Sequence, residues 1–235
     1  MTLELRPRKL VKVLAIIVGL VILADVLTLI STYAFGRNYV YGLVPLFSLD
    51  QEQNVPTFVS SAMWLLSASL AFAIAAAEKT RGRSYLYWAG LCLICLYISL
   101  DEFAEIHERF VNAWIRGPAG TDKPFYMSWV LVYGPLVVVI AVLFGRFVLR
   151  LPAEIRRLII IAGGTYVFGA IGFEEISGVY LKTHDWSFGL GYNLVTLFEE
   201  TLEMTAVVML IYALMSYAAK YAGGLSLRIA TPRAE

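Results

Sequence analysis

Charged residues are scarce in this sequence, and so are cysteine and histidine. Asp, Glu, Lys and Arg make up 16% of the 235 residues and hydrophobic residues 59%, whereas soluble globular domains average about 25% charged and about 45–50% apolar residues. This composition excludes an ordinary soluble enzyme. Two cysteines are too few for a disulfide scaffold. A formal net charge of +1 gives no electrostatic reason to expect nucleic acid as a partner.

Long apolar runs dominate instead. A helix that crosses the apolar core of a bilayer, about 30 Å thick, needs about 20 residues. Six runs of suitable length are present, at residues 10–35, 56–77, 84–116, 127–151, 158–181 and 192–219, and the third becomes polar beyond residue 100. The connections are too short for a second domain. We therefore predict an all-α membrane protein: one polytopic domain over residues 1–235, folded as a six-transmembrane-helix bundle in a lipid bilayer.

The basic residues predict how this bundle is oriented. Lys and Arg accumulate in short loops on the cytoplasmic side of a membrane. With the N-terminus inside, that side receives most of the 19 basic residues: Arg6, Arg8, Lys9, Lys12, Lys79, Arg81, Arg83, Arg146, Arg150, Arg156, Arg157, Lys220, Arg228 and Arg233. We expect an N-in/C-in multi-pass protein of the cell membrane, which is the cytoplasmic (inner) membrane if the source is bacterial.

Carboxylates show the opposite distribution and gather in the outer halves of three runs. The set comprises Asp101, Glu102, Glu105, Glu108, Glu174, Glu175, Glu199, Glu200 and Glu203. At a rise of 1.5 Å per residue, the deepest acid of each run lies about 25 Å from the cytoplasmic end of its helix. The three helices therefore place acids at one level. Ionisable residues inside a membrane are costly and rarely face lipid, so this layer predicts a functional site that faces the extracytoplasmic side.

The negative charge of these carboxylates must be neutralised, and this requirement limits what the layer can bind. Crowded carboxylates repel one another, so protons or bound cations must neutralise part of the charge. Carboxylate oxygens suit hard or borderline cations, and the shortage of His and Cys disfavours copper and structural zinc. We expect a divalent metal ion, Mn, Fe, Mg or Ca. The predicted ligands are Asp101, Glu105, Glu174, Glu175, Glu199, Glu200 and Glu203.

The pattern [DE]-E-x-x-E occurs at residues 101–105 and again at 199–203. Two such pairs on antiparallel helices are similar in geometry to carboxylate-bridged di-metal bundles, although the Glu-x-x-His element of those proteins is missing. A competing interpretation is that some acids of residues 101–108 are hydrated where the helix leaves the bilayer.

Three residues are the candidates for acid–base catalysis: Glu105, Glu200 and His107. On a continuous helix His107 would point about 200° away from Glu105, so it is either a ligand or acid–base group or an interfacial ring that bonds a carboxylate.

Asp25 lies at nearly the same depth as the acidic layer. It either contributes to that layer or forms a hydrogen bond in the core. Gly163, Gly164 and Gly172 are small enough to permit close helix contact. Trp129 lies near a predicted membrane boundary, where tryptophan is common. The polar residues within 47–61 form either a solvated loop or a lid over the acidic site.

This arrangement is compatible with three different functions. The first is a divalent-metal-dependent membrane enzyme that acts on a lipid or amphipathic small molecule, because the acids lie near the outer headgroup level. The second is a cation- or proton-coupled transporter or channel, although the cytoplasmic halves of the helices carry few polar groups. The third is an accessory or sensor subunit without catalysis.

Overall fold

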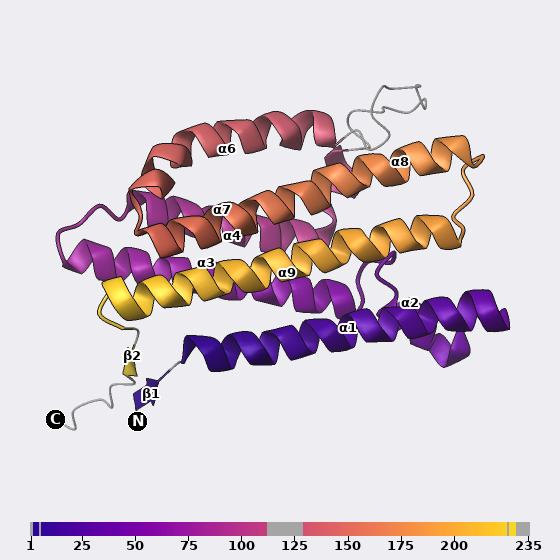
Figure 1. The fold of residues 1–235 in the computed structure, drawn as a ribbon, viewed down its shortest axis with the longest axis horizontal. Helices are drawn as coiled ribbons and strands as arrows, with labels where there is room; N and C mark the ends of the chain where they lie inside the picture. The colour runs from indigo at the N-terminus through magenta and orange to yellow at the C-terminus, as the bar shows by residue number, and fades with distance from the viewer. Residues whose placement is uncertain (1, 5, 112–128, 225, 229–235) are drawn as a thin grey trace.

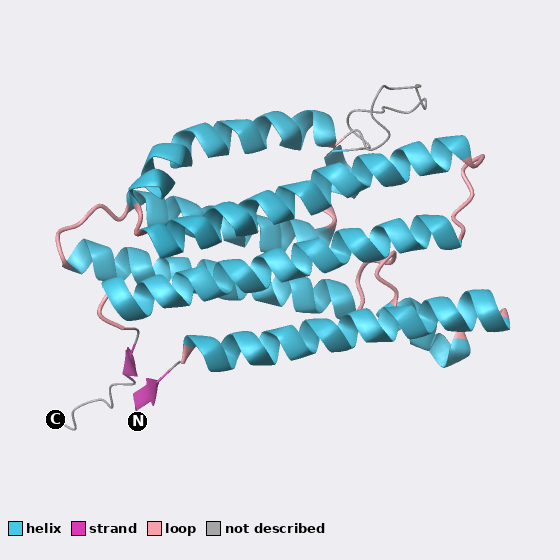
Figure 2. Cartoon of the chain, in the orientation of Figure 1, coloured by secondary structure: helices cyan, strands magenta, loops and turns pink. Residues whose placement is uncertain are grey.

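The computed structural model describes residues 2–4, 6–111, 129–224 and 226–228, and helices account for nearly all of them (Figures 1 and 2). The α-helices are α1 (Pro7–Phe35), α2 (Leu43–Phe47), α3 (Val55–Thr80), α4 (Leu86–Ala104), α6 (Val130–Arg150), α7 (Ala153–Val167), α8 (Glu174–Thr183) and α9 (Leu190–Tyr221). The shorter elements are the 3-10 helix η1 (Val40–Gly42), the π-helices η2 (Ile106–Val111) and η3 (Phe168–Phe173), and the strands β1 (Thr2–Glu4) and β2 (Ser226–Arg228). The two strands pair antiparallel.

Within the described ranges, six helical segments are long and apolar enough to cross a membrane, as expected for a multi-pass, helical membrane protein. Five of them are α1, α3, α4, α6 and α9, and the sixth joins α7, η3 and α8 over Ala153–Thr183. The predicted boundaries agree within a few residues except for the run at 84–116. There α4 ends at Ala104 and η2 follows, while residues 112–116 lie outside the described residues.

Helix α9 is the centre of the bundle, and α1, α3, α7, η3 and α8 pack against it (Figure 1). Small residues such as Ala206, Ala213 and Ala218 are almost fully buried along α9, so neighbouring backbones can approach closely. Helix α6 is the opposite case. It lies at the edge of the bundle, and most of its apolar side chains are exposed on the surface that would face lipid.

Polar groups fix the turn between α1 and α3. Asn54 caps α3 by accepting a hydrogen bond from the Thr57 amide at 3.2 Å, and its Nδ2 donates to the Ser48 carbonyl oxygen at 2.6 Å. Asp25 is buried inside α1 and accepts the Leu49 amide at 3.0 Å. Of the two roles considered for Asp25, the described contacts favour the hydrogen bond in the core, because this carboxylate holds the turn.

A glycine that the sequence analysis did not single out, Gly169, lies at a close contact between two helices. A methyl group at Gly169 would lie 3.0 Å from Glu203 Cγ and 3.3 Å from the Glu199 carbonyl oxygen, so η3 touches α9 here. Gly163 and Gly164 do not lie at a close helix contact, because no atom of another described segment lies within 4 Å of a methyl group built there. At Gly172 the neighbouring atoms belong to Phe168 of the same segment.

Candidate functional site

A cavity of about 950 Å³ lies inside the bundle between α3, α4, α6, α7, η3 and α9. One end is acidic: its lining contains Asp50, Glu52, Asp101, Glu102, Glu174, Glu199, Glu200 and Glu203. The lining toward the other end is apolar and includes Leu91, Ile94, Phe144, Phe147, Val148 and Ile159. We call these parts the acidic end and the apolar end. The space is therefore amphipathic along the bundle axis.

The acidic end is built at a break in the third span. Glu105 has a left-handed backbone (φ 53°, ψ 42°), which ends α4 and starts the π-helical segment η2. Non-glycine residues in this conformation are strained, and such strain is often found at functional sites. Segments of π-helix are likewise frequent at functional sites, and η3 provides a second one across the cavity.

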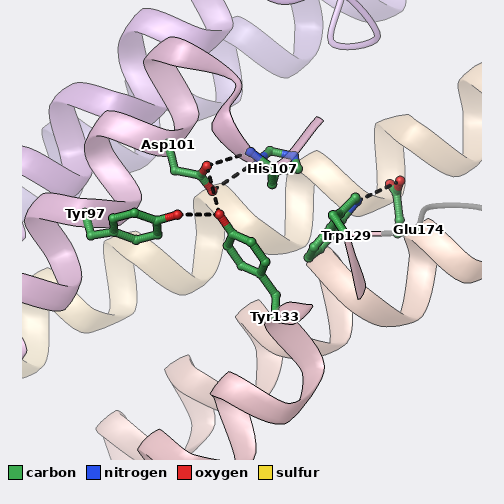
Figure 3. Close-up of polar contacts among 6 residues, drawn as sticks. All are labelled: Tyr97, Asp101, His107, Trp129, Tyr133 and Glu174. Atoms are coloured by element: carbon green, nitrogen blue, oxygen red, sulfur yellow. Dashed lines mark hydrogen bonds and ion pairs between the residues drawn. The ribbon is translucent and has the colours of Figure 1, made fainter. Parts of the chain in front are cut away.

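The break folds His107 back onto Asp101. The His107 amide donates to Asp101 Oδ1 at 2.9 Å, and His107 Nδ1 lies 3.1 Å from Asp101 Oδ2 (Figure 3). The helix assumed for His107 stops at Ala104, and the structure places His107 on the cavity wall, bonded to a carboxylate, whereas Glu105 does not line the cavity. With Nδ1–H donating to Asp101, the imidazole would have Nε2 as its basic nitrogen.

Aromatic side chains extend this polar cluster toward α6. Tyr133 Oη donates to Asp101 Oδ1 at 3.2 Å and also contacts the hydroxyl of Tyr97 (Figure 3). Trp129 packs its ring against His107, with 5.0 Å between the ring centroids, and its Nε1 donates to Glu174 Oε1 at 3.3 Å. Trp129 lies at the start of α6, and its buried side chain connects η2, α6 and α8 in one network; the predicted position at the membrane boundary stays a prediction.

On the opposite wall, α9 presents its acids to η3 and α8. Glu174 of α8 and Glu199 of α9 are both buried and both line the cavity on this wall. Glu203 packs against Gly169 and lines the same wall of the cavity as Tyr166. The absence of a side chain at Gly169 thus allows α9 to bring Glu199 and Glu203 against the neighbouring span.

The structure brings most of the predicted site residues to this one cavity. Those that line it are Asp101, His107, Glu174, Glu199, Glu200 and Glu203. Asp50 and Glu52, from the loop considered as a lid, line it as well. The level predicted from the helical rise therefore corresponds to the acidic end. The roles of these residues as ligands or acid–base groups stay predictions.

Glu105 and Glu175 are not among the residues that line the cavity. Glu105 is buried and forms a two-pronged ion pair with Arg109, whose Nη2 lies 2.8 Å from Glu105 Oε1. Glu175 lies one residue beyond Glu174 on α8, so it points in another direction, and its buried Oε1 has no hydrogen-bond partner among the described residues. The side chain of Glu108 lies outside the described part of the chain.

Within the described residues, no group of three or more His, Cys, Asp or Glu side chains is arranged to hold a metal ion. The acids share a cavity but are spread over its wall. Aromatic residues fill part of the space between them: Trp64, Trp129, Tyr133, Tyr166 and Tyr192 all line the cavity. Sequence reasoning missed these aromatics, because tyrosine and tryptophan are common throughout the apolar runs and nothing in their spacing marks them.

Residues 13–218 match the family described as a domain of unknown function (DUF8692), so the chain belongs to this family. The matched region contains every residue of the acidic end. No curated protein and no solved structure matches the chain.

Proposed function

We propose that this protein is a membrane enzyme that acts on a lipid or another amphipathic molecule, with its reaction at the acidic end of the cavity. The observation that carries the proposal is the cavity itself. Its volume is at the upper end of the range of about 300–1,000 Å³ that is usual for ligand sites, and it joins a polar end to an apolar end inside a membrane-spanning bundle. An alkyl chain fits the apolar end while a polar group meets Asp101 and His107.

The pair Asp101–His107 is the candidate for acid–base chemistry. A carboxylate that binds one ring nitrogen of histidine fixes the tautomer and raises the basicity of the other nitrogen, which can then take a proton from water or from a substrate hydroxyl. Tyr133 supports the same carboxylate from α6. In this proposal Glu200 and Glu203 complete the polar wall.

The proposal also includes a divalent metal ion bound by the carboxylates, and this part can be tested separately. Carboxylate oxygens are suitable donors for such an ion, and it would polarise a substrate oxygen or lower the energy of a bound hydroxide. The spread of the acids in the described residues means that side chains would have to turn toward one another to ligate it. Metal analysis of purified protein, with Glu203→Gln and Glu174→Gln for comparison, tests this addition by itself.

We also propose that the acidic end faces the extracytoplasmic side, because most basic residues lie in the loops at the opposite end. The apolar lining supports an enzyme over an ion carrier. Among the described lining residues toward the apolar end, such as Leu91, Val148 and Ile159, there are no charged groups to replace the water of a crossing ion.

The test is untargeted lipid analysis by mass spectrometry. Purified protein is incubated with a total lipid extract, and the lipid species before and after are compared for wild type, His107→Ala and His184→Ala. His184 is the matched control, because it is exposed and stacks on Tyr180 with 4.0 Å between the ring centroids. We expect conversion of a lipid class by wild type and His184→Ala and loss of conversion in His107→Ala.

Thermal unfolding of each variant verifies that it is folded. The proposal is wrong if wild type changes no lipid in the extract, or if folded His107→Ala converts lipid at the wild-type rate.

A further inference from the structure

The wall of the cavity is interrupted toward its apolar end, on the side where α6 faces α7. Five residues of these two helices line the cavity and are also exposed or half-exposed on the surface of the bundle: Ala141, Gly145, Leu149, Ile160 and Gly163. Leu149 is 63% exposed and Ile160 is 52% exposed. A residue borders the cavity and the surface at once only where the wall is open or one side chain thick. We call the space between these five residues the α6–α7 slot.

Two glycines leave the slot unfilled. Small residues in a membrane bundle usually let neighbouring helices touch. Here, however, no atom of another described segment lies within 4 Å of a methyl group built at Gly145 or at Gly163, although both residues line the cavity. The space beside them is therefore not taken by a neighbouring helix, and a chain of methylene groups has room to pass.

The seam between α6 and α4 is different at the same level. Tyr87 of α4 stacks on Phe147 of α6 with 4.9 Å between the ring centroids. A methyl group at Gly90 of α4 would lie only 2.9 Å from Phe144 Cζ. Aromatic rings of α6 thus fill this seam, so at this level the cavity is closed toward α4 and open toward α7.

The slot lies within the membrane-spanning part of both helices and opens sideways. Its residues belong to the spans Val130–Arg150 and Ala153–Thr183. The short connection between α6 and α7 closes one end of the slot, and there Arg156 Nη1 donates to the Leu149 carbonyl oxygen at 3.0 Å. Figure 1 shows α6 at the edge of the bundle, with this connection at one extremity. The medium outside the slot is therefore the apolar core of the bilayer.

The distance from the acidic end to the slot is short compared with a lipid chain. Tyr133 bonds Asp101 at the acidic end, and Ala141 follows eight residues later, which corresponds to about 12 Å of helix. An octyl chain is shorter than this distance, whereas a hexadecyl chain is longer. A lipid whose polar group lies at the acidic end therefore brings the middle of a long chain to the slot.

We infer that the substrate is a lipid whose alkyl chain is longer than the cavity and runs out through the α6–α7 slot into the bilayer. This inference rests on the proposed function and specifies its substrate class. The site then selects the polar group of the lipid and sets no upper limit on the length of its chain. Gly145 and Gly163 are the residues that determine this property.

The experiment compares octyl glucoside with hexadecyl glucoside, whose common sugar can donate hydrogen bonds to the carboxyl groups of the acidic end. Purified protein is kept in digitonin, a detergent without an alkyl chain, and bound glucoside is counted by native mass spectrometry at increasing probe concentration. Gly145→Phe and Gly163→Phe place a ring in the slot from α6 and from α7. Each should weaken binding of hexadecyl glucoside at least about tenfold, because each buried methylene group contributes about a factor of four and several would lose their place. Octyl glucoside should bind both variants as tightly as it binds wild type.

Gly164→Phe is the matched control. Gly164 is adjacent to Gly163 on α7 and is exposed, but it does not line the cavity. A ring at this position should leave the binding of both probes unchanged. Each variant is compared with wild type for the same probe, which cancels the partition of that probe into the micelle. Thermal unfolding verifies that each variant is folded, and the use of plugs on two helices guards against one that fails to fold.

The outcomes separate the inference from the proposed function. The inference is wrong if hexadecyl glucoside binds either folded plug variant as tightly as wild type, if Gly164→Phe weakens it equally, or if octyl glucoside is weakened as much. Conversion of lipid by wild type would still support the proposed function in each of these cases. Binding of neither probe to wild type overturns the cavity as a site for an alkyl chain, and the proposed function with it.

Discussion

Gly169 offers a direct test of the contact that builds the acidic end. In Gly169→Ala the new methyl group would meet Glu203 Cγ at 3.0 Å and the Glu199 carbonyl oxygen at 3.3 Å, so η3 and α9 must separate by a few tenths of an ångström. Overpacking of this kind costs about 1–3 kcal/mol. Alanine gains about 0.8–1.0 kcal/mol over glycine in helix propensity, which offsets part of the cost.

The matched control is Gly164→Ala, since Gly164 is in the same span and, among the described residues, no other segment has an atom within 4 Å of a methyl group there. This variant gains the helix propensity without the contact. The two variants should therefore differ by about 1–3 kcal/mol in the free energy of unfolding. For a chain of this size that difference corresponds to roughly 2–12 °C in the midpoint of thermal unfolding.

The assay is thermal unfolding of the two variants in the same detergent, followed by tryptophan fluorescence. If Gly169→Ala is as stable as Gly164→Ala, then the close approach of η3 to α9 does not hold the acidic end together.

Three further substitutions test the frame around the cavity, each by thermal unfolding against wild type. Asp25→Ala leaves the buried Leu49 amide without its acceptor and should cost about 1–3 kcal/mol, and an unchanged midpoint would contradict that role. Asn54→Ala removes the cap of α3 and should cost about 0.5–2 kcal/mol, whereas no loss would mean that water replaces the cap. Trp88→Ala removes a side chain that is 1% exposed and should cost about 3–5 kcal/mol, more than truncation of the exposed Leu93, and equal costs would refute its place in the core.

The spans and the depth of the acids were predictable because both depend on local geometry. Apolar run length sets the spans, and a fixed rise per residue sets the level of Asp101 and Glu203 as long as their helices stay regular. α9 is an unbroken helix throughout, and α4 is regular up to Ala104. The grouping of these acids around one cavity follows from the same arithmetic.

The break at Glu105 could not be predicted in the same way. The residues around it contain no glycine or proline, and glutamate and alanine favour a continued helix. Contacts that are remote from the local pattern accompany the break: Asp101 accepts the His107 amide, and Tyr133 of α6 bonds the same carboxylate. The position of His107 depends on this break, and so does the separation of Glu105 from the cavity.

Helix α6 is fastened to the rest of the molecule at its two extremities. Tyr87 stacks on Phe147 at one extremity, and Tyr97 meets Tyr133 at the other. Between these two contacts Leu136, Val137 and Ile140 of α6 form part of the cavity wall. Substitutions in the middle of α6 should therefore change the width of the molecule that can enter the cavity past this helix. Substitutions of the ring residues at its two ends should instead detach α6 from the bundle.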